Sequence, residues 1–241
     1  MLIAILSDIH SNLEAFLAVV DNMEKRDPDM VVCLGDLIGY GPDPEETVQL
    51  VLEKGYHCVL GNHEAALIEP KMRNWLNFQA KENSRETEQL MSHETLSYCR
   101  GLKNNMIIEG GEFVHGFPPD SVLTYLTMVT EDDISSYFFT SATNITFVGH
   151  THDLLIASWD GKKVVRKKLP LGKYSLQPDK RYIINAGSVG QPRDGDNCAK
   201  YLLWDTVAHF IEVIYVPYDF KTTAQKIEDR GFPKAYGYRL R

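Results

Sequence analysis

The sequence predicts an α/β protein built on two stacked β-sheets. In residues 2–60, short apolar segments alternate with segments whose apolar residues repeat at helical intervals, an order that predicts a parallel sheet with right-handed crossovers. In the last third of the chain, apolar segments follow one another with only turns between them, which predicts a second, largely antiparallel sheet packed on the first. Because no repeat, low-complexity segment or linker divides the chain, we expect a single domain over residues 1–241.

The first half of the chain carries signals for where each element begins and ends. Three short, continuous apolar segments are typical of buried strands: residues 2–6, 30–34 and 57–60. The first helix is expected to begin at Ser11, because Ser11 and Glu14 have the spacing of a capping box. For the second helix, Asp43 and Pro44 are an N-cap and a first-turn proline, and Gly55 stands where a C-terminal cap belongs.

Residues 70–105 interrupt this order. They are polar, lack runs of β-branched residues and suit two helices, the second beginning near Ser92 and ending near Arg100 and Gly101. We therefore expect a helical insertion at about residues 70–105 that borders the functional site. Strand-like segments then resume at residues 106–108, 112–114, 145–148, 154–159, 163–168, 182–185, 199–204 and 209–216.

Composition and charge narrow the functional classes. The 241 residues are 44% hydrophobic and 24% charged, as in an ordinary globular protein. The formal net charge of -8 argues against a protein whose main partner is DNA or RNA. The one dense basic run, residues 162–168 (KKVVRKK), is interpreted as a solvated hairpin in preference to a nucleic-acid patch.

The cysteines and the apolar segments indicate neither secretion nor a membrane. The four cysteines form no CxxC pair, and Cys33 and Cys58 lie within apolar runs, where a free thiol packs as a small hydrophobe. The chain opens directly with a strand segment, and no apolar run approaches the roughly 20 residues that span a bilayer. We expect a cytoplasmic protein with no membrane partner.

Residues able to bind metals follow five of the predicted strands. The strands lead into Asp8-Ile9-His10, Gly35-Asp36, Gly61-Asn62-His63, His115-Gly116 and Gly149-His150-Thr151-His152. Ligands of an open α/β sheet bind outside the carboxyl ends of its strands, which lie only about 5 Å apart. Within each D-x-H or H-x-H pair, the period-two geometry of a strand aims both side chains the same way.

Each of these fragments is weak evidence when taken singly. A lone histidine after a strand is more often a turn or core residue, and a lone Gly-Asp is often a turn. Five of the eight histidines, however, occupy these strand ends, while His57, His93 and His209 do not and are expected to be structural or surface residues. The convergence of all five ends favours a metal site.

In this order the five blocks resemble the calcineurin-like metallophosphoesterase superfamily. Its pattern is D-x-H, G-D, G-N-H, a single H and G-H-x-H, and the resemblance runs from the first strand to beyond residue 190. The stretches SDIHSNLEA, GDLIGYGPDP and NAGSVGQPRDGD are similar to a prokaryotic branch of small, stand-alone members. The resemblance implies a four-layer α/β/β/α sandwich, in which two mixed β-sheets are flanked by helices.

The resemblance also implies a two-metal phosphoesterase, in which a hydroxide that bridges the metals attacks the phosphorus in line. One metal would be held by Asp8, His10, Asp36 and His152, and the other by Asp36, Asn62, His115 and His150. This mixture of ligands suits manganese first, with iron, zinc, cobalt or nickel as alternatives, better than calcium. The absence of cysteine ligands argues against a structural zinc site.

Further residues near these blocks are candidates for catalysis or substrate binding. Because a histidine pKa near 6.5 suits proton exchange, His63 is expected to hydrogen-bond the phosphate or protonate the leaving oxygen. Its alternative is a turn histidine without chemistry. Many relatives have aspartate at the next position, where this chain has Glu64, so an orienting role for Glu64 stays open.

Three more residues are predicted to bind substrate. The planar fork of Arg193 suits a distal phosphate, although a surface arginine beside a turn is nearly as good an interpretation. Asn12 and Tyr40 closely follow ligand blocks and are expected to face the pocket. Asn12 fits a helix start equally well, and Tyr40 fits a packing aromatic.

The leading functional hypothesis is a metal-dependent hydrolase of a small phosphodiester or phosphomonoester. A hydrolase of dinucleoside polyphosphates or other nucleotides is the alternative within that class. A catalytically silent binding protein on the same fold is a second class, disfavoured because every expected metal position is filled. A nuclease is disfavoured by the charge and by the lack of a basic-aromatic track. The sequence carries no signal for the oligomeric state.

Overall fold

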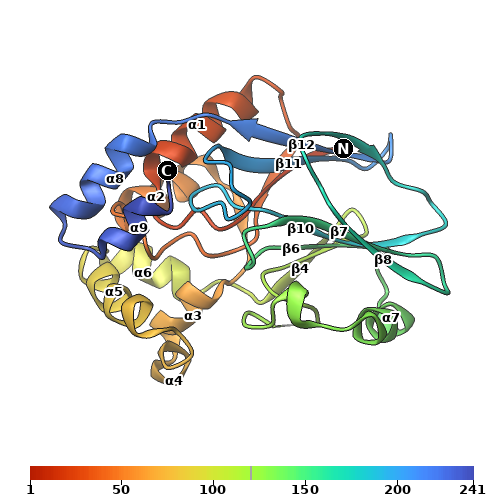
Figure 1. Cartoon of the computed structure of the whole chain (residues 1–241), viewed down its shortest axis with the longest axis horizontal. Helices are drawn as coiled ribbons and strands as arrows, with labels where there is room; N and C mark the ends of the chain where they lie inside the picture. Colours follow the sequence, from red (N-terminus) through yellow and green to blue (C-terminus); the bar gives the residue numbers. More distant parts are fainter. Residues whose placement is uncertain (120) are drawn as a thin grey trace.

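The computed structural model describes residues 1–119 and 121–241. Its strands form two six-stranded mixed sheets that are stacked on each other, with helices on both outer sides (Figure 1). The predicted four-layer α/β/β/α sandwich is therefore confirmed.

The first sheet has the order β3-β2-β1-β11-β12-β9. Its strands are β1 (Leu2–Leu6), β2 (Met30–Cys33), β3 (His57–Cys58), β9 (Gly172–Ser175), β11 (Ala199–Asp205) and β12 (Phe210–Val216). The second sheet has the order β4-β5-β6-β10-β7-β8. Its strands are β4 (Asn105–Ile108), β5 (Gly111–Val114), β6 (Ile145–Val148), β7 (Leu154–Trp159), β8 (Val164–Lys168) and β10 (Arg181–Ala186).

The helices gather in three places (Figure 1). Beside the first sheet lie α1 (Leu13–Glu24) and α2 (Pro44–Lys54); α8 (Phe220–Asp229) packs against α1, and α9 (Lys234–Tyr238) packs against α8. Beside the second sheet lie η1 (Leu126–Met128) and α7 (Glu131–Thr140). At one end of the sandwich are α3 (Asn62–Ile68), α4 (Pro70–Arg73), α5 (Phe78–Gln89) and α6 (His93–Arg100).

The alternation of side chains along β1 shows how the layers pack. Ala4 and Leu6 point into the core between the first sheet and its helices, together with Phe16 of α1. Ile3 and Ile5 point the other way, into the core between the two sheets. All of these side chains are fully buried. Because successive residues of a strand face opposite sides, a continuous apolar strand is what a sheet covered on both faces requires.

The strands of the last third do not form one separate antiparallel sheet, so that prediction is wrong. β11, β12 and β9 extend the first sheet, where β11 pairs antiparallel with β1, whereas β7, β8 and β10 join β4, β5 and β6 in the second. The reason is that β1 pairs with β2 on one edge and offers its other edge to β11. Apolar pattern predicts a strand but does not specify which open edge it pairs with.

Most boundaries near the site agree with the sequence, and the start of the first helix does not. Asn12, not Ser11, is the N-cap of α1, because the Asn12 Oδ1 atom accepts a hydrogen bond from Ala15 N at 3.1 Å. Ser11 has a φ of 53° and lies in the preceding loop. The caps expected at Asp43 and Gly55 of α2 and at Ser92 of α6 are in place.

Several short elements carried no decisive sequence signal. β9, α7, α8 and α9 were not expected, and the third strand is reduced to His57–Cys58. The run at residues 162–168 lies in the expected hairpin, since β7 and β8 pair antiparallel. Cys33 and Cys58 are buried, as predicted. In the described part of the chain, no helix is both long enough and apolar enough to cross a membrane.

Candidate metal centre

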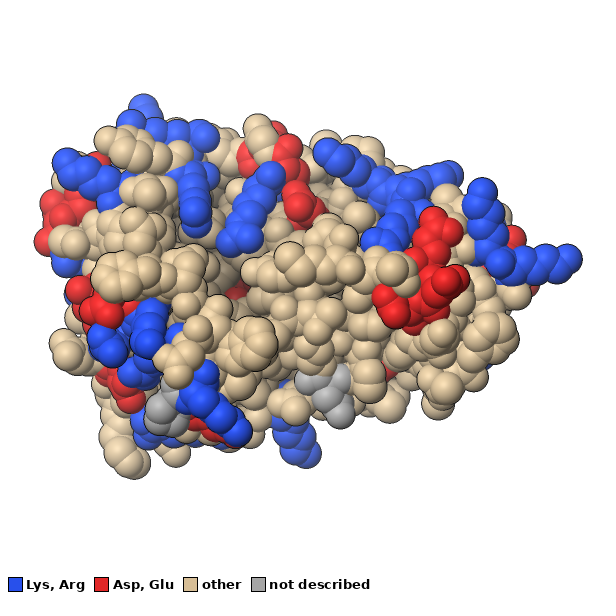
Figure 2. Space-filling view, turned by 60° about the horizontal axis from the view of Figure 1, so that its bottom comes forward, with Lys and Arg blue, Asp and Glu red and all other residues tan. Residues whose placement is uncertain are grey.

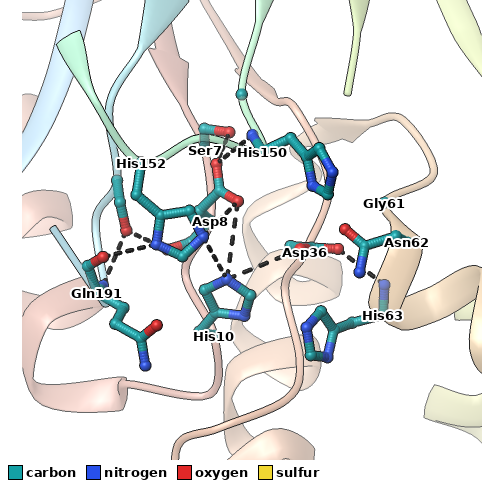
Figure 3. Close-up of polar contacts among 12 residues, drawn as sticks. Ser7, Asp8, His10, Asp36, Gly61, Asn62, His63, His150, His152 and Gln191 are labelled. Carbon is teal, nitrogen blue, oxygen red and sulfur yellow. Dashed lines mark hydrogen bonds and ion pairs between the residues drawn. The ribbon is translucent and has the colours of Figure 1, made fainter. Parts of the chain in front are cut away.

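The fold brings the polar residues of all five strand ends together at one edge of the sandwich. Figure 3 shows most of them, from the loops after β1 and β2, the start of α3 and the loop after β6. All are at most 6% exposed: Asp8, His10, Asp36, Asn62, His63, His115, His150 and His152. The three remaining histidines, His57, His93 and His209, are exposed and lie outside this cluster.

The backbone at the cluster is strained in the same way at five positions. Asp8, His10, Asp36, His150 and His152 all have φ between 50° and 68°, in the left-handed region that residues other than glycine seldom adopt. Such a conformation costs of order 1–3 kcal/mol per residue and is retained where the surroundings impose it, commonly at functional sites. The strain turns these side chains inward at the point where each strand ends.

Two glycines let the loops approach closely enough for this. A Cβ atom on Gly61 would lie 2.2 Å from both Asp36 N and Asp36 Oδ1, and one on Gly149 would lie 1.9 Å from Ser7 Oγ. There is no room for a side chain at either position. The glycines of the G-N-H and G-H-x-H blocks are therefore needed for packing against the loops that carry the carboxylates.

One nitrogen of each of four histidines faces a backbone carbonyl. The pairs are His10 Nδ1–Ile38 O at 3.0 Å, His115 Nδ1–Leu34 O at 2.7 Å, His152 Nδ1–Gln191 O at 2.6 Å and His150 Nε2–Leu123 O at 3.2 Å. A carbonyl oxygen only accepts hydrogen bonds, so each of these nitrogens carries the proton. In the neutral ring, the other nitrogen is left with a free lone pair that points into the centre.

These lone pairs face one another at short range. His10 Nε2 lies 3.1 Å from His152 Nε2, and His115 Nε2 lies 3.2 Å from His150 Nδ1 and 3.1 Å from Asn62 Oδ1. Two acceptors at this distance repel each other unless a proton or a cation lies between them. The donor set therefore fits cations held at two neighbouring positions.

The carboxylates give the same indication. Asp8 Oδ1 lies 3.2 Å from His152 Nε2, and Asp36 Oδ2 lies 3.4 Å from His115 Nε2 and 3.7 Å from His10 Nε2. Among the described residues, no group donates a hydrogen bond to either oxygen, although both are buried. A buried carboxylate oxygen without a donor is costly, and a metal ion removes that cost.

The other oxygen of each carboxylate is held by the protein. Asp8 Oδ2 accepts from Ser7 Oγ at 2.5 Å and from His150 N at 3.0 Å, and Asp36 Oδ1 accepts from His63 N at 2.9 Å (Figure 3). Each carboxylate is thus oriented by one oxygen and presents the other to the centre. This division is typical of metal ligands that are fixed by their surroundings.

The pKa values reflect a centre that demands positive charge. Burial opposes ionisation of Asp8 and Asp36, yet the neighbouring histidines hold the pKa of both carboxyls below its usual range. Burial also opposes protonation of His115, but Asp36 and Asp8 raise its pKa to about 9. For His150, burial and His115 lower the pKa to about 4. Bound cations would supply the positive charge that the protonated His115 ring carries in their absence.

Distances divide the ligand candidates into overlapping groups. In each group the potential ligand atoms lie within 4.8 Å of one another, and the groups are Asp8, His10 and His152; Asp36, His115 and His150; and His10, Asp36 and His63. The first two groups each contain three members of one ligand set implied by the family resemblance. Asp36 belongs to two groups, as a bridging carboxylate would.

His63 lies at the edge of the centre. Its ring is 5.0 Å from the His10 ring and 4.6 Å from the Tyr40 ring, centroid to centroid, and it is 3% exposed. Burial lowers its pKa, while Asp36 opposes the shift. A hydrogen bond to phosphate and delivery of a proton both stay predictions for His63.

Glu64 does not face the centre. Its carboxylate accepts hydrogen bonds from three backbone N–H groups, those of Asp36 at 2.9 Å, Ile38 at 3.1 Å and Gly61 at 3.0 Å. It is fully buried, and burial together with Asp36 raises its pKa to about 7. Glu64 therefore joins the loop that carries Asp36 to the loop that carries Asn62, a role that sequence reasoning left open.

Asn12 uses its hydrogen-bonding capacity within the protein. Its Oδ1 accepts from Ala15 N and from Thr223 Oγ1 at 3.0 Å, and its Nδ2 donates to Gly190 O at 2.8 Å and to Tyr218 Oη at 3.1 Å. With two donors and two acceptors occupied, the amide is satisfied. These contacts favour the helix-start interpretation over substrate binding.

Tyr40 and Arg193 lie near each other beside the centre: burial raises the pKa of Tyr40, and the charge of Arg193 opposes that shift. The Tyr40 ring packs against His10, His63 and Tyr236, with centroid distances of 4.7, 4.6 and 5.0 Å. Arg193 is exposed and donates from Nη2 to Gln191 Oε1 at 3.3 Å. Tyr40 therefore fits the interpretation as a packing aromatic, and Arg193 is an exposed residue beside the centre.

Sequence reasoning missed several residues that hold the ligands. Ser7 and Gln191 bind Asp8 and His152 through the contacts given above, and Tyr125 stacks on the His150 ring with centroids 3.9 Å apart. Ser7 and Gln191 lie within the SDIHSNLEA and NAGSVGQPRDGD stretches, so adjacency to a motif was an available signal. Tyr125 comes from a loop with no such signal.

Comparison with known proteins finds relatives over nearly the whole chain. The chain is 35% identical over 246 residues to an uncharacterised protein of Methanocaldococcus jannaschii, covering 99% of this chain and 97% of that protein. A metallophosphoesterase structure from Sphaerobacter thermophilus is similar with a TM-score of 0.84 and 32% identity, covering 100% and 98% of the two chains. A protein of Pyrococcus horikoshii OT3 shares the fold, with a TM-score of 0.75, 20% identity and coverages of 99% and 97%.

The family assignment rests on a match to a family model and on the motifs. Residues 1–209 match the calcineurin-like phosphoesterase superfamily domain, and all five ordered motif blocks lie within that span. The chain therefore belongs to the calcineurin-like phosphoesterase superfamily, which supports a metal-dependent phosphoesterase in general.

Proposed function

We propose that this protein hydrolyses a small phosphodiester or phosphomonoester at a centre of two divalent cations. The observation that carries the proposal is the set of facing lone pairs described above, those of His10 and His152 on one side and of His115, His150 and Asn62 on the other. Manganese is the ion we propose first, because imidazole, carboxylate and amide ligands suit it.

The residues have separate tasks in holding the ions. Asp8, His10 and His152 would hold one, His115, His150 and Asn62 the other, and Asp36 both. When bound, such cations neutralise phosphoryl oxygens and lower the pKa of water towards about 7. The protein fixes each ligand beforehand, through the carbonyls that orient the histidines and the donors that orient the carboxylates.

The residues around the centre would position the substrate. His63, at the edge of the centre, would donate a hydrogen bond to a phosphoryl oxygen. Arg193 beside the centre is placed to contact a further phosphate or the far side of the ester. In this proposal Asn12 only supports the loop, because its polar atoms are already bonded.

A panel assay with Mn²⁺ tests the proposal. The substrates are p-nitrophenyl phosphate, its bis ester and diadenosine polyphosphates, which separate monoesterase, diesterase and polyphosphate hydrolase activities. Asp36→Asn should lose nearly all bound metal, and its turnover should fall by about 10³-fold or more. An amide is neutral and has only one oxygen, so it cannot bridge two cations as a carboxylate does. Asp205→Asn, at the last residue of β11, is the control that should keep activity, because among the described residues its carboxylate accepts only from the turn that follows the strand.

Two results would contradict the proposal. Full turnover by the Asp36→Asn variant would exclude the two-metal centre. Wild-type protein that binds two metal ions and an inert phosphate analogue, yet turns over no substrate in the panel, would favour the silent binding protein instead.

A further inference from the structure

A cleft of about 650 Å³ opens directly from the candidate metal centre. Asn62 and His150, both ligand candidates, form part of its wall. Its other walls come from the connection between α4 and α5 and from the segment between β5 and η1. A phosphate held at the centre would therefore have its organic group directed into this cleft, whose volume is in the range of small-molecule sites.

Aromatic, apolar and uncharged polar side chains line the cleft. Trp75, Leu76, Leu123, Tyr125 and Met128 line it, and its described lining residues include no lysine, arginine, aspartate or glutamate. Figure 2 shows one face of the molecule, on which lysine and arginine side chains stand towards both ends and also above the middle, with uncharged side chains between them. The lining residues themselves offer no charged partner to the organic group, and the Arg193 side chain, which hydrogen-bonds Tyr125, is a cation next to this lining.

Two large apolar side chains that line this cleft are exposed. Trp75 is 73% exposed and Met128 is 76% exposed. Single exposed apolar residues are ordinary, but here both border one cavity beside a phosphate-binding centre. Indole and thioether groups both make favourable contacts with the face or edge of a planar ring.

Aromatic contact continues from the rim to the centre. Tyr125 stacks on His150 with an interplanar angle of 18°, and Tyr40 packs edge-on against His63. Both tyrosines also line the cleft. The cleft therefore offers aromatic side chains both at exposed Trp75 and next to the metal-ligand candidates.

We propose that the cleft binds an uncharged planar ring in the organic part of the phosphate ester, between Trp75 and Met128. This proposal rests on the proposed function for the position of the phosphate. It assigns to the connection between α4 and α5 the selection of substrate, and to the strand ends the binding of phosphate.

Equilibrium binding of three phosphonates to the manganese-loaded protein tests this without any turnover. Phenylphosphonate, cyclohexylphosphonate and methylphosphonate share one head group and differ in the size and planarity of the organic part. Phenylphosphonate should bind about tenfold more tightly than methylphosphonate, the effect of one stacked ring. Cyclohexylphosphonate should fall between them, because it buries apolar area without stacking.

Alanine variants show which side chains cause the preference for phenylphosphonate. Trp75→Ala and Met128→Ala should each reduce the ratio of phenylphosphonate to methylphosphonate affinity to about threefold or less, as expected when one stacked contact is lost, and leave methylphosphonate affinity unchanged. Phe78→Ala is the matched control, since Phe78 is 79% exposed and is not among the residues that line the cleft.

The outcomes separate the two proposals. Equal affinity of all three phosphonates, or equal affinity of the phenyl and cyclohexyl compounds, would overturn the ring-binding cleft even if the ester panel shows turnover. A tenfold preference that depends on Trp75, in a protein that hydrolyses no ester, would keep the cleft and overturn the phosphoesterase.

Discussion

Two cavities of similar volume flank the segment that contains η1. The cleft at the metal centre measures about 650 Å³ and has Met128 in its wall, whereas a cavity beside α7 measures about 700 Å³ and has Val129 in its wall. The larger one contains none of the metal-ligand candidates. Volume therefore does not identify the functional site, and the convergence of buried ligands does.

The polar groups in the two cavities also differ in what they face. Beside α7, the Glu112 carboxylate accepts a hydrogen bond from the Tyr137 hydroxyl, which also contacts Thr146 Oγ1 at 2.7 Å. At the metal centre, Asp8 Oδ1 and Asp36 Oδ2 are buried and have no hydrogen-bond donor among the described residues. The first arrangement is complete within the protein, and the second requires a cation.

The largest expected effect comes from the support of the metal centre. Glu64→Ala leaves three buried N–H groups without an acceptor, so the free energy of unfolding should fall by more than about 3 kcal/mol. Metal affinity should fall with it, because the loops of Asp36 and Asn62 are no longer joined. Thermal unfolding and metal titration measure the two effects.

Glu64→Gln keeps the volume of the side chain and tests the role if the alanine variant does not fold. It should bind metal more weakly than wild type, because an amide nitrogen cannot accept. Glu69→Ala, beyond the same helix and largely exposed, is the control and should be neutral. Unchanged metal affinity in the Gln variant would contradict the role of Glu64.

A smaller effect is expected from the loop that carries Gln191 and Arg193. Lys200 is fully buried, and its ammonium contacts Asp194 Oδ1 at 2.7 Å and Asp196 O at 2.5 Å. Lys200→Met should cost about 2 kcal/mol, less than a fully buried pair because Asp194 reaches solvent. Metal affinity should also fall, since Gln191 O orients His152 in this loop.

Chemical denaturation and metal titration of the Lys200→Met variant test this. Lys173→Met is the matched control, because Lys173 is exposed and lies over the Phe210 ring at 3.3 Å from its centroid. If the two variants have equal metal affinity, the Lys200 ion pair has no part in positioning the loop.

The smallest effect is expected at the cavity beside α7. Tyr137→Phe removes one hydroxyl from a hydrogen-bonded network, which should cost about 1 kcal/mol of stability. Ester hydrolysis and metal affinity should remain within about twofold of wild type, a difference of less than 0.5 kcal/mol. A large loss of activity with little loss of stability would show that the comparison between the two cavities is wrong.

The sequence predicted the metal-ligand candidates but not the residues that hold them in place. The five strand ends were readable because each combines a short apolar run with an adjacent histidine or carboxylate, and the strands that share an edge bring such residues together. Glu64 was visible only as a neighbour of His63, because its three partners come from loops 26 to 28 positions earlier and from a backbone turn. The pairing of β11 with β1 was hidden for the same reason, since it joins distant segments.

The sequence by itself determined the fold class, the family and the ligand candidates, because these depend on local apolar pattern and on the order of short motifs along the chain. Only the tertiary structure decided which nitrogen of each histidine faces the centre, that Asn12 caps a helix, that Glu64 holds two loops together, and that Trp75 and Met128 border one cleft. Each of those facts depends on a distance between residues far apart in sequence, and such distances are set by the packing of the whole chain.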